Sequence, residues 1–342
     1  MKNLVRSLSL ATAALTTMGV GFAQDEPARE APKAIYDTSA DARVLLDAAQ
    51  KLARRDGKRV LVMFGGNWCG WCHRLHGLFE SNAGVRKLLR DEYELVLVDI
   101  GKWDKHMDLA AAYGADLRKH GVPFLTVLDE TGKALANQDT SSLEDGDAHD
   151  PAKVLGFLDA QKAPMRVAED VLRAAQTEAE KSDRRLLVHF GAPWCGWCHR
   201  LEDFLAVPEI AAAIAKDYVD VKIDEDRMQG GKDCEARIRK GRKGGIPWIL
   251  IAEHDLTELA TSDGPKGNTG YPAKDHEIEH FIGMLTATRR QLTDEDLALI
   301  RRTLEQNAQA IEAASAKARA EREAKTKAKQ AEAEAAPVTP RR

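Results

Sequence analysis

Eight residues, Trp-Cys-Gly-Trp-Cys-His-Arg-Leu, occur twice in this 342-residue chain, at 68–75 and at 194–201, and the two copies begin 126 positions apart. They contain four of the five cysteines, arranged as two C-x-x-C pairs. Such a pair suits thiol–disulfide exchange, in which one thiolate attacks a disulfide and the other resolves the mixed disulfide. An exact internal repeat indicates one domain-sized module that is present twice.

The cysteines of each motif are expected at the start of a helix that follows a strand. There, unpaired backbone N–H groups and the helix dipole stabilise a thiolate on the first cysteine. Cys69 and Cys195 are therefore the expected nucleophiles. Cys72 and Cys198 lie one turn further on and are the expected resolving thiols.

Both halves of the chain predict the same order of elements: helix, strand, motif, helix, strand, helix, proline, strand, hairpin and helix. The apolar, β-branched segments that we expect to be strands are 59–64, 93–100 and 124–128 in the first half, and 185–190, 218–224 and 248–251 in the second. This order predicts two α/β sandwiches, each with a mixed central sheet.

A proline precedes the third strand of each half, at Pro123 and at Pro247, more than fifty residues after the first cysteine. Together with the apolar strand and the Trp-Cys-Gly-x-Cys sequence, this arrangement resembles the thioredoxin family. The resemblance implies that both prolines are cis and lie beside the disulfide. It also implies that the residue before each, Val122 or Ile246, offers backbone hydrogen bonds to a bound peptide.

The resemblance implies an enzyme, a protein-disulfide oxidoreductase whose direction as reductase, oxidase or isomerase stays open, with no cofactor and no metal. Its substrates would be proteins with thiols or disulfides, and an unidentified redox partner would exchange electrons with it. We expect Trp68 and Trp194 to flank the first sulfur and shape the docking surface. His73 and His199 follow the motif cysteines directly and are either solvated residues or charged groups that stabilise a thiolate.

The chain departs from the family at the position six residues before the first cysteine. The family often has a buried acid there, which accepts the proton of the resolving thiol, whereas this chain has Met63 and His189. His189 is either a satisfied core residue or a base. If it is a base, the second site should resolve mixed disulfides faster than the first. Cys234 lies in an insertion and is expected to be an unpaired thiol without a catalytic role.

The two motifs also allow three other interpretations. Cys-x-x-Cys-His is also the attachment signature of c-type haem, but the apolar strands and the two prolines have no role in a haem site. A zinc site would require the two cysteine pairs to meet across the domains. A thioredoxin-like adaptor that binds without catalysis is the broader alternative, and it predicts that cysteine-to-serine changes leave binding intact.

Residues 1–23 predict a cleavable export signal, with Lys2 and Arg6 ahead of an apolar stretch and cleavage after Ala23. An exported protein, in the periplasm for example, occupies an oxidising compartment in which disulfides persist. The formal net charge of −4 argues against a nucleic-acid partner, which would require a basic face. We expect no stable membrane span after signal cleavage, because no other segment is apolar enough.

The predicted division of the mature chain has four parts: a linker at 24–38, thioredoxin-like domains at 39–162 and 163–290, and a helix with a low-complexity tail at 291–342. Thr293 and Asp296 have the spacing of a helix start. Beyond Ile311 the chain is dominated by Ala, Glu, Lys and Arg, which predicts a solvated helix or a disordered tail. The missing heptad positions weigh against a coiled coil.

Overall fold

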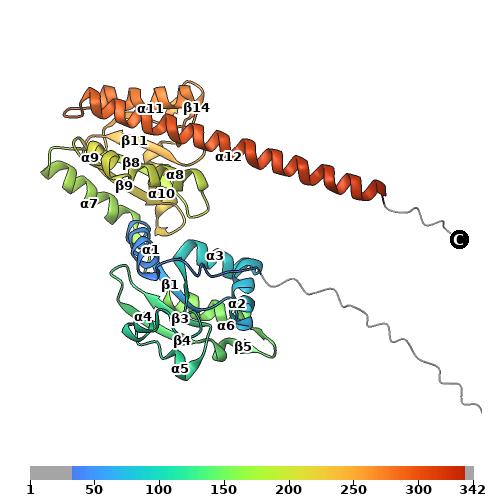
Figure 1. Cartoon of the computed structure of the whole chain (residues 1–342). Helices are drawn as coiled ribbons and strands as arrows, with labels where there is room; N and C mark the ends of the chain where they lie inside the picture. The colour runs from blue at the N-terminus through green and yellow to red at the C-terminus, as the bar shows by residue number, and fades with distance from the viewer. Residues whose placement is uncertain (1–32, 336–342) are drawn as a thin grey trace, which may run out of the picture.

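The computed structural model describes residues 33–335, so the predicted export signal, its cleavage site and most of the predicted linker lie outside the described residues. Two four-stranded sheets form the cores of two α/β domains, and one long helix extends from the second domain (Figure 1). Over residues 33–335, no helix combines the length and the apolar character that crossing a membrane requires.

The first sheet has the strand order β2-β1-β3-β4 and is mixed, as the sequence predicts. The central strand β1 pairs parallel with β2 and antiparallel with β3, which in turn pairs antiparallel with β4. The strands are β1 (Arg59–Gly65), β2 (Tyr93–Asp99), β3 (Phe124–Leu128) and β4 (Ala134–Asp139).

Helices cover both faces of the first sheet because successive side chains of a strand point to opposite faces. Val62 of β1 packs in a cluster with α1, α4 and α5, whereas Met63 packs in a cluster with α2, α3 and α6. The helices are α1 (Ala42–Asp56), α2 (Gly70–Ser81), α3 (Ala83–Glu92), α4 (Met107–Ala112), α5 (Leu117–His120) and α6 (Pro151–Gln161).

The second domain repeats this pattern with the strand order β12-β11-β8-β9. Its strands are β8 (Arg185–Gly191), β9 (Tyr218–Asp224), β11 (Trp248–Ala252) and β12 (Glu258–Thr261). Helices α7 and α10 pack on one face of the sheet, and α8, α9, α11 and α12 pack on the other. These helices are α7 (Ala168–Lys181), α8 (Gly196–Leu205), α9 (Pro208–Ile214), α10 (Gly231–Arg239), α11 (Asp275–Thr288) and α12 (Asp294–Ala335).

Helix α12 has two parts with different roles. Leu297, Ile300 and Leu304 are buried in the core of the second domain, so its first turns belong to that domain. From Glu312 to Lys327 every side chain is exposed, and this part projects away from the body of the protein (Figure 1). The low-complexity tail is therefore helical as far as Ala335, and its side chains are solvated from Glu312 to Lys327.

Residues 35 and 36, at the end of the predicted linker, are bound to the first domain in the structure. The backbone N–H groups of Ile35 and Tyr36 donate to Asn67 Oδ1 at 2.8 and 2.9 Å, and Asn67 Nδ2 donates back to Tyr36 O. The Tyr36 side chain is only 3% exposed. Periodicity could not predict this attachment, because one amide side chain beside the first motif holds two backbone groups from a non-repeating segment.

Candidate active sites

The first dithiol begins α2. Cys69 is the N-cap residue, and its Sγ accepts a hydrogen bond from Cys72 N at 3.1 Å. The two sulfurs form a disulfide, in which Cys69 is 6% exposed and Cys72 is fully buried. Cys69 Sγ lies 3.5 Å from the carbonyl oxygen of Val122, and the Val122–Pro123 peptide bond is cis. The structure thus brings the predicted cysteines and proline of the first half together.

The second dithiol has the same geometry at the start of α8. Cys195 Sγ accepts a hydrogen bond from Cys198 N at 3.1 Å, and the two sulfurs form a disulfide. Cys195 Sγ lies 3.6 Å from Ile246 O, and the Ile246–Pro247 peptide bond is cis. Each cysteine pair therefore closes on itself within its own domain.

The tryptophan before each pair is exposed and anchored at its ring nitrogen. Trp68 is 50% exposed and donates from Nε1 to Gly101 O at 2.5 Å. Trp194 is 56% exposed and donates to Asp226 Oδ2 at 2.7 Å. Such a ring offers a fixed apolar face to solvent beside the outer sulfur.

A cavity of about 400 Å³ lies beside the second dithiol and is lined in part by Trp197, Pro247 and Tyr271. The rings of Trp197 and Tyr271 are stacked with centroids 6.2 Å apart. In the first domain, the equivalent Trp71 meets His149 edge-on instead, at 5.2 Å. The surfaces next to the two dithiols therefore differ in shape although the motifs are identical.

The position six residues before the first cysteine is apolar in one domain and polar in the other. Met63 is fully buried in a cluster that includes Cys69 and Cys72. His189 is 3% exposed, and its Nε2 lies 3.2 Å from Asp220 Oδ1. The first dithiol therefore packs against an apolar side chain at this position. In the second domain the same position of the central strand holds a buried histidine that contacts an aspartate.

Glu202 is a charged residue near the second dithiol that sequence reasoning missed. It is 3% exposed, and its Oε1 lies 2.8 Å from Lys222 Nζ. A Cβ placed on Gly191 would lie 3.4 Å from Cys198 Sγ and 3.6 Å from Glu202 Oε1, so the carboxylate and the inner sulfur flank the same residue. The available signal was the position directly after the repeated octapeptide, which is His76 in one copy and Glu202 in the other.

Glu202 and His199 affect each other's protonation. Burial opposes ionisation of Glu202, but His199 and Lys222 outweigh it and lower the pKa of the carboxyl. In return, the Glu202 carboxylate, with Oε2 3.5 Å from His199 Nδ1, raises the pKa of His199. The first motif has no carboxylate at this position, because His76 stands there.

Tyr36 is a second residue that sequence reasoning missed, and it lies beside the first dithiol. A Cβ placed on Gly65 would collide with both the Tyr36 hydroxyl and Cys72 Sγ. The hydroxyl is buried and has no hydrogen-bond partner among the described residues. Burial, and then the charge of Asp99, raise the pKa of Tyr36 well above its ordinary value, so the hydroxyl keeps its proton.

Cys234 is buried in α10 and forms no disulfide, which confirms the prediction of an unpaired thiol. Burial raises its pKa to about 11, so it is a neutral thiol at physiological pH. Thiolate chemistry at neutral pH requires the opposite shift. Its lack of a catalytic role stays a prediction.

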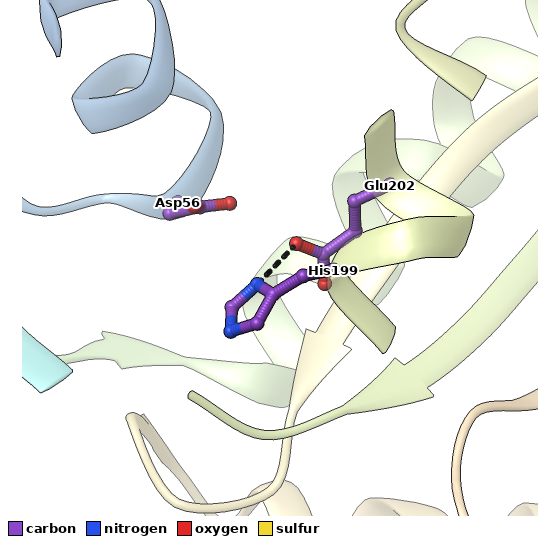
Figure 2. A group of neighbouring side chains, drawn as sticks. All are labelled: Asp56, His199 and Glu202. Carbon is purple, nitrogen blue, oxygen red and sulfur yellow. Dashed lines mark ion pairs between the residues drawn. The ribbon is translucent and has the colours of Figure 1, made fainter. Parts of the chain in front are cut away.

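Three side chains with metal-ligating atoms meet where the two domains touch: Asp56, His199 and Glu202, whose ligand atoms lie within 4.8 Å of one another (Figure 2). The Lys222 ammonium contacts both carboxylates, at 3.1 Å from Asp56 Oδ1 and 2.8 Å from Glu202 Oε1. Because this positive charge already compensates the carboxylates and would repel a cation, the group does not fit a metal site.

Comparison with known proteins agrees with this geometry. The model of the thioredoxin-like family matches residues 41–130 and 167–253. Protein disulfide-isomerase erp38 of Neurospora crassa is 29% identical over 185 residues, which are 53% of this chain and 47% of that protein. Protein disulfide-isomerase tigA of Aspergillus niger is 26% identical over 234 residues, which are 64% of this chain and 58% of that protein.

Among solved structures, the disulphide isomerase from Xylella fastidiosa Temecula1 is similar to one part of the chain. It has 28% sequence identity and a TM-score of 0.34, over 37% of this chain and 95% of that protein. The chain spans about half the length of the curated relatives that it matches. The family model covers just over half of the chain, in two segments that each contain one of the motifs, and the chain belongs to the thioredoxin-like family.

Proposed function

We propose that the protein is a thiol–disulfide oxidoreductase that acts on protein disulfides through two CGWC dithiols. One observation carries this proposal. In both domains the outer cysteine caps a helix, is bonded to a buried partner and lies 3.5 or 3.6 Å from the carbonyl before a proline. Relatives that are named protein disulfide-isomerases support the same substrate class.

The reaction needs only the four motif cysteines for its covalent steps. In the reducing direction, the thiolate of Cys69 or Cys195 attacks one sulfur of a substrate disulfide and expels the other as a thiolate. The thiolate of Cys72 or Cys198 then attacks the mixed disulfide, closes the enzyme disulfide and releases the second substrate thiolate. Two electrons pass to the substrate, and the reverse sequence oxidises a substrate dithiol.

The position of the outer cysteine supports its role as the nucleophile. The N–H group of the inner cysteine already donates to the outer sulfur in both domains. The unpaired N–H groups at a helix start and the helix dipole favour a negative charge at that place. The inner sulfur is nearly or fully buried, so a protein substrate reaches the outer sulfur first.

The surrounding residues have proposed roles in substrate approach. Trp68 and Trp194 offer apolar faces beside the outer sulfurs. The carbonyls before Pro123 and Pro247 are available to the N–H groups of an extended substrate segment, as in strand addition. His189 is proposed as the proton acceptor of the second site, since it occupies the position that the family resemblance assigns to that group.

The compartment and the redox partner are part of the same proposal. The N-terminal sequence supports an exported protein, for example in a periplasm, with cleavage after Ala23. In the reducing direction an electron donor must restore the dithiols, and in the oxidising direction an electron acceptor must restore the disulfides. The reduction potential of each domain, measured against glutathione, decides between these directions.

Insulin reduction and refolding of a scrambled, disulfide-bonded substrate test the proposal. We expect activity to survive in Cys69→Ser/Cys72→Ser and in Cys195→Ser/Cys198→Ser, and to be lost when all four are replaced. If the quadruple variant performs like the native protein, the catalytic proposal is wrong. Retained binding of a substrate by an inactive native protein would support an adaptor, and a Soret band in the purified protein would support haem attachment.

A further inference from the structure

The first domain reaches into the surroundings of the second dithiol. Asp56, the last residue of α1, places its carboxylate within 4.8 Å of a ring nitrogen of His199 and of the Glu202 carboxylate. Figure 2 shows Asp56 at the end of the first domain's helix, facing two side chains of α8. His199 directly follows Cys198 in the motif. A side chain of one domain therefore lies beside the active-site motif of the other.

The contact is part of a buried group of charges. Asp56 is 7% exposed and Glu202 is 3% exposed, and Lys222 Nζ contacts both. Arg55, next to Asp56, donates to Asp203 Oδ1 at 2.8 Å and lies 3.6 Å from Glu202 Oε2. Because Asp56, Glu202 and Lys222 are largely removed from water, each of these charges has a strong effect on the protonation of its neighbours.

Asp56 is held at this place by its backbone as well as by its side chain. Arg227 of the second domain donates to Asp56 O at 2.7 Å, to Gly57 O at 3.1 Å and to Glu92 Oε2 at 2.8 Å. These bonds fix the end of α1 against the second domain without using the Asp56 carboxylate. A change from carboxylate to amide at Asp56 therefore removes a charge and keeps this anchor.

The two ring nitrogens of His199 both face acceptors. Nε2 lies 2.8 Å from Pro193 O, a carbonyl that can only accept, so Nε2 carries a proton. Nδ1 lies 3.5 Å from the Glu202 carboxylate. A ring with acceptors at both nitrogens is best satisfied as the imidazolium, in which both nitrogens donate.

The first motif lacks this arrangement. His73 Nε2 lies 2.9 Å from Asn67 O, as in the second motif, but the next turn offers His76 in place of Glu202. Helix α7 is the second domain's counterpart of α1. At its end it has Lys181 and Ser182 where α1 has Arg55 and Asp56, so the second domain has no equivalent of the Asp56 carboxylate. Within residues 33–335, a group of two carboxylates and a motif histidine is therefore found at the second motif and not at the first.

We propose that Asp56 is a positioning residue of the second active site that the first domain supplies. Together with Glu202, it holds His199 as an imidazolium next to Cys198, and this charge stabilises the thiolates of the second dithiol. The inference rests on the proposed oxidoreductase function for its role in catalysis, although the protonation of His199 can be tested without it.

Some of the charges around His199 raise its pKa and others lower it. The ionisable groups around this interface come from both domains and are Arg55, Asp56, Lys58, Glu92, Arg166, His189, Glu202, Asp203, Asp220, Lys222 and Arg227. Glu202 raises the pKa of His199, and burial and the Lys222 ammonium oppose it, with a net upward result. Asp56 keeps its charge throughout the physiological range, because Arg55 and Lys222 outweigh its burial and lower its pKa to about 2.

Titration of the histidine rings by NMR in the full chain tests the proposal. Asp56→Asn removes a negative charge and should lower the pKa of His199, whereas Arg55→Met removes a positive charge and should raise it, each by about half a unit or more. Both variants remove an interface contact, so a purely structural role would move His199 in the same direction. His199→Gln assigns the resonance, and His73 should be unaffected.

The consequence for the thiols is measured with Cys69→Ser/Cys72→Ser, so that only the second dithiol reacts. We expect the pH profile of its alkylation by iodoacetamide to contain an inflection at the pKa of His199. That inflection should move to lower pH in Asp56→Asn and return in Asp56→Glu, which keeps the charge. Lys51→Met is the matched control, because it breaks an exposed ion pair with Asp47 on the same helix.

The two hypotheses fail in different ways. An unchanged His199 titration in a folded Asp56→Asn protein, or shifts of the same sign in both charge variants, would overturn the proposal. If Asp56→Asn does not fold, Arg55→Met and Asp56→Glu carry the test. A native protein without disulfide-exchange activity contradicts the proposed function, and the titration of His199 still decides whether Asp56 controls its protonation.

Discussion

The Tyr36 hydroxyl and the Cys72 sulfur lie against the same backbone position, Gly65 at the end of β1. The equivalent position in the second domain, Gly191, separates Cys198 from the Glu202 carboxylate. Two identical motifs therefore rest on different polar groups, a neutral hydroxyl in one domain and a charged carboxylate in the other. Because the inner sulfur becomes a thiolate during resolution, these groups should influence that step differently.

Tyr36→Phe should slow resolution at the first site. The hydroxyl has no other partner among the described residues, so it is free to donate to the Cys72 thiolate, and a hydrogen bond to a charged group contributes about 1.5–3 kcal/mol. We expect resolution of a trapped mixed disulfide to slow by about tenfold, measured in Cys195→Ser/Cys198→Ser. The second site, measured in the complementary variant, is the internal control. An equal effect at both sites would indicate a general loss of structure.

His189→Gln should slow resolution at the second site toward the rate of the first. The native second site is expected to be the faster of the two, because Met63 offers no base at the equivalent position. Rapid-quench trapping of the mixed disulfide on each domain measures both rates. Asp220→Asn removes the partner of His189 and serves as the control for its orientation. Equal native rates, unchanged in His189→Gln, would exclude a role for this histidine.

Helix α12 should contribute to stability only through its first turns. Ile300→Ala leaves a cavity in the core of the second domain and should lower the free energy of unfolding by about 2–5 kcal/mol. A chain that ends after residue 313 loses only side chains that the structure shows exposed or does not describe. We therefore expect it to keep the native Tm. A fall in Tm comparable with that of Ile300→Ala would show that the projecting part packs against another surface.

The sequence predicted those features that recur along the chain. These features are local or repeated patterns: strands such as 59–64 and 185–190, the helix starts at Cys69 and Cys195, and the prolines Pro123 and Pro247. The family resemblance predicted that the peptide bonds before both prolines are cis, and the structure confirms this prediction. Because the same pattern occurs in both halves of the chain, each copy supports the interpretation of the other, and that agreement made the fold predictable.

The residues that distinguish the two sites could not be predicted in the same way. Tyr36 precedes the first helix in a segment with no counterpart pattern, and Asp56 ends a helix of the other domain. Their proximity to the cysteines depends on the path of the chain and on how the domains dock, neither of which is a local property of sequence. Of these residues, Glu202 alone could have been noticed in the sequence, because it is the first position after the motif at which the two copies differ.

The contact between the domains should weaken in acid because of Asp56. Its pKa is lowered from 3.8 to about 2 in the folded protein, so its contribution is complete above pH 4 and is lost as the pH falls toward 2. This shift corresponds to about 2 kcal/mol. His199 has a raised pKa, so its contribution has the opposite dependence: it is complete below its ordinary value and is lost as the pH rises through the folded value.

Chemical denaturation of the native protein and of Asp56→Asn at a series of pH values measures the Asp56 contribution. We expect the difference in the free energy of unfolding to be largest near pH 5, where Asp56 is ionised and His199 is protonated, and to shrink as the pH falls below 4. Asp47→Asn, on the exposed face of the same helix, should show a much smaller difference at every pH. A difference that does not change between pH 5 and pH 2.5 would contradict the lowered pKa of Asp56, because a group that titrates normally in both states adds no pH dependence.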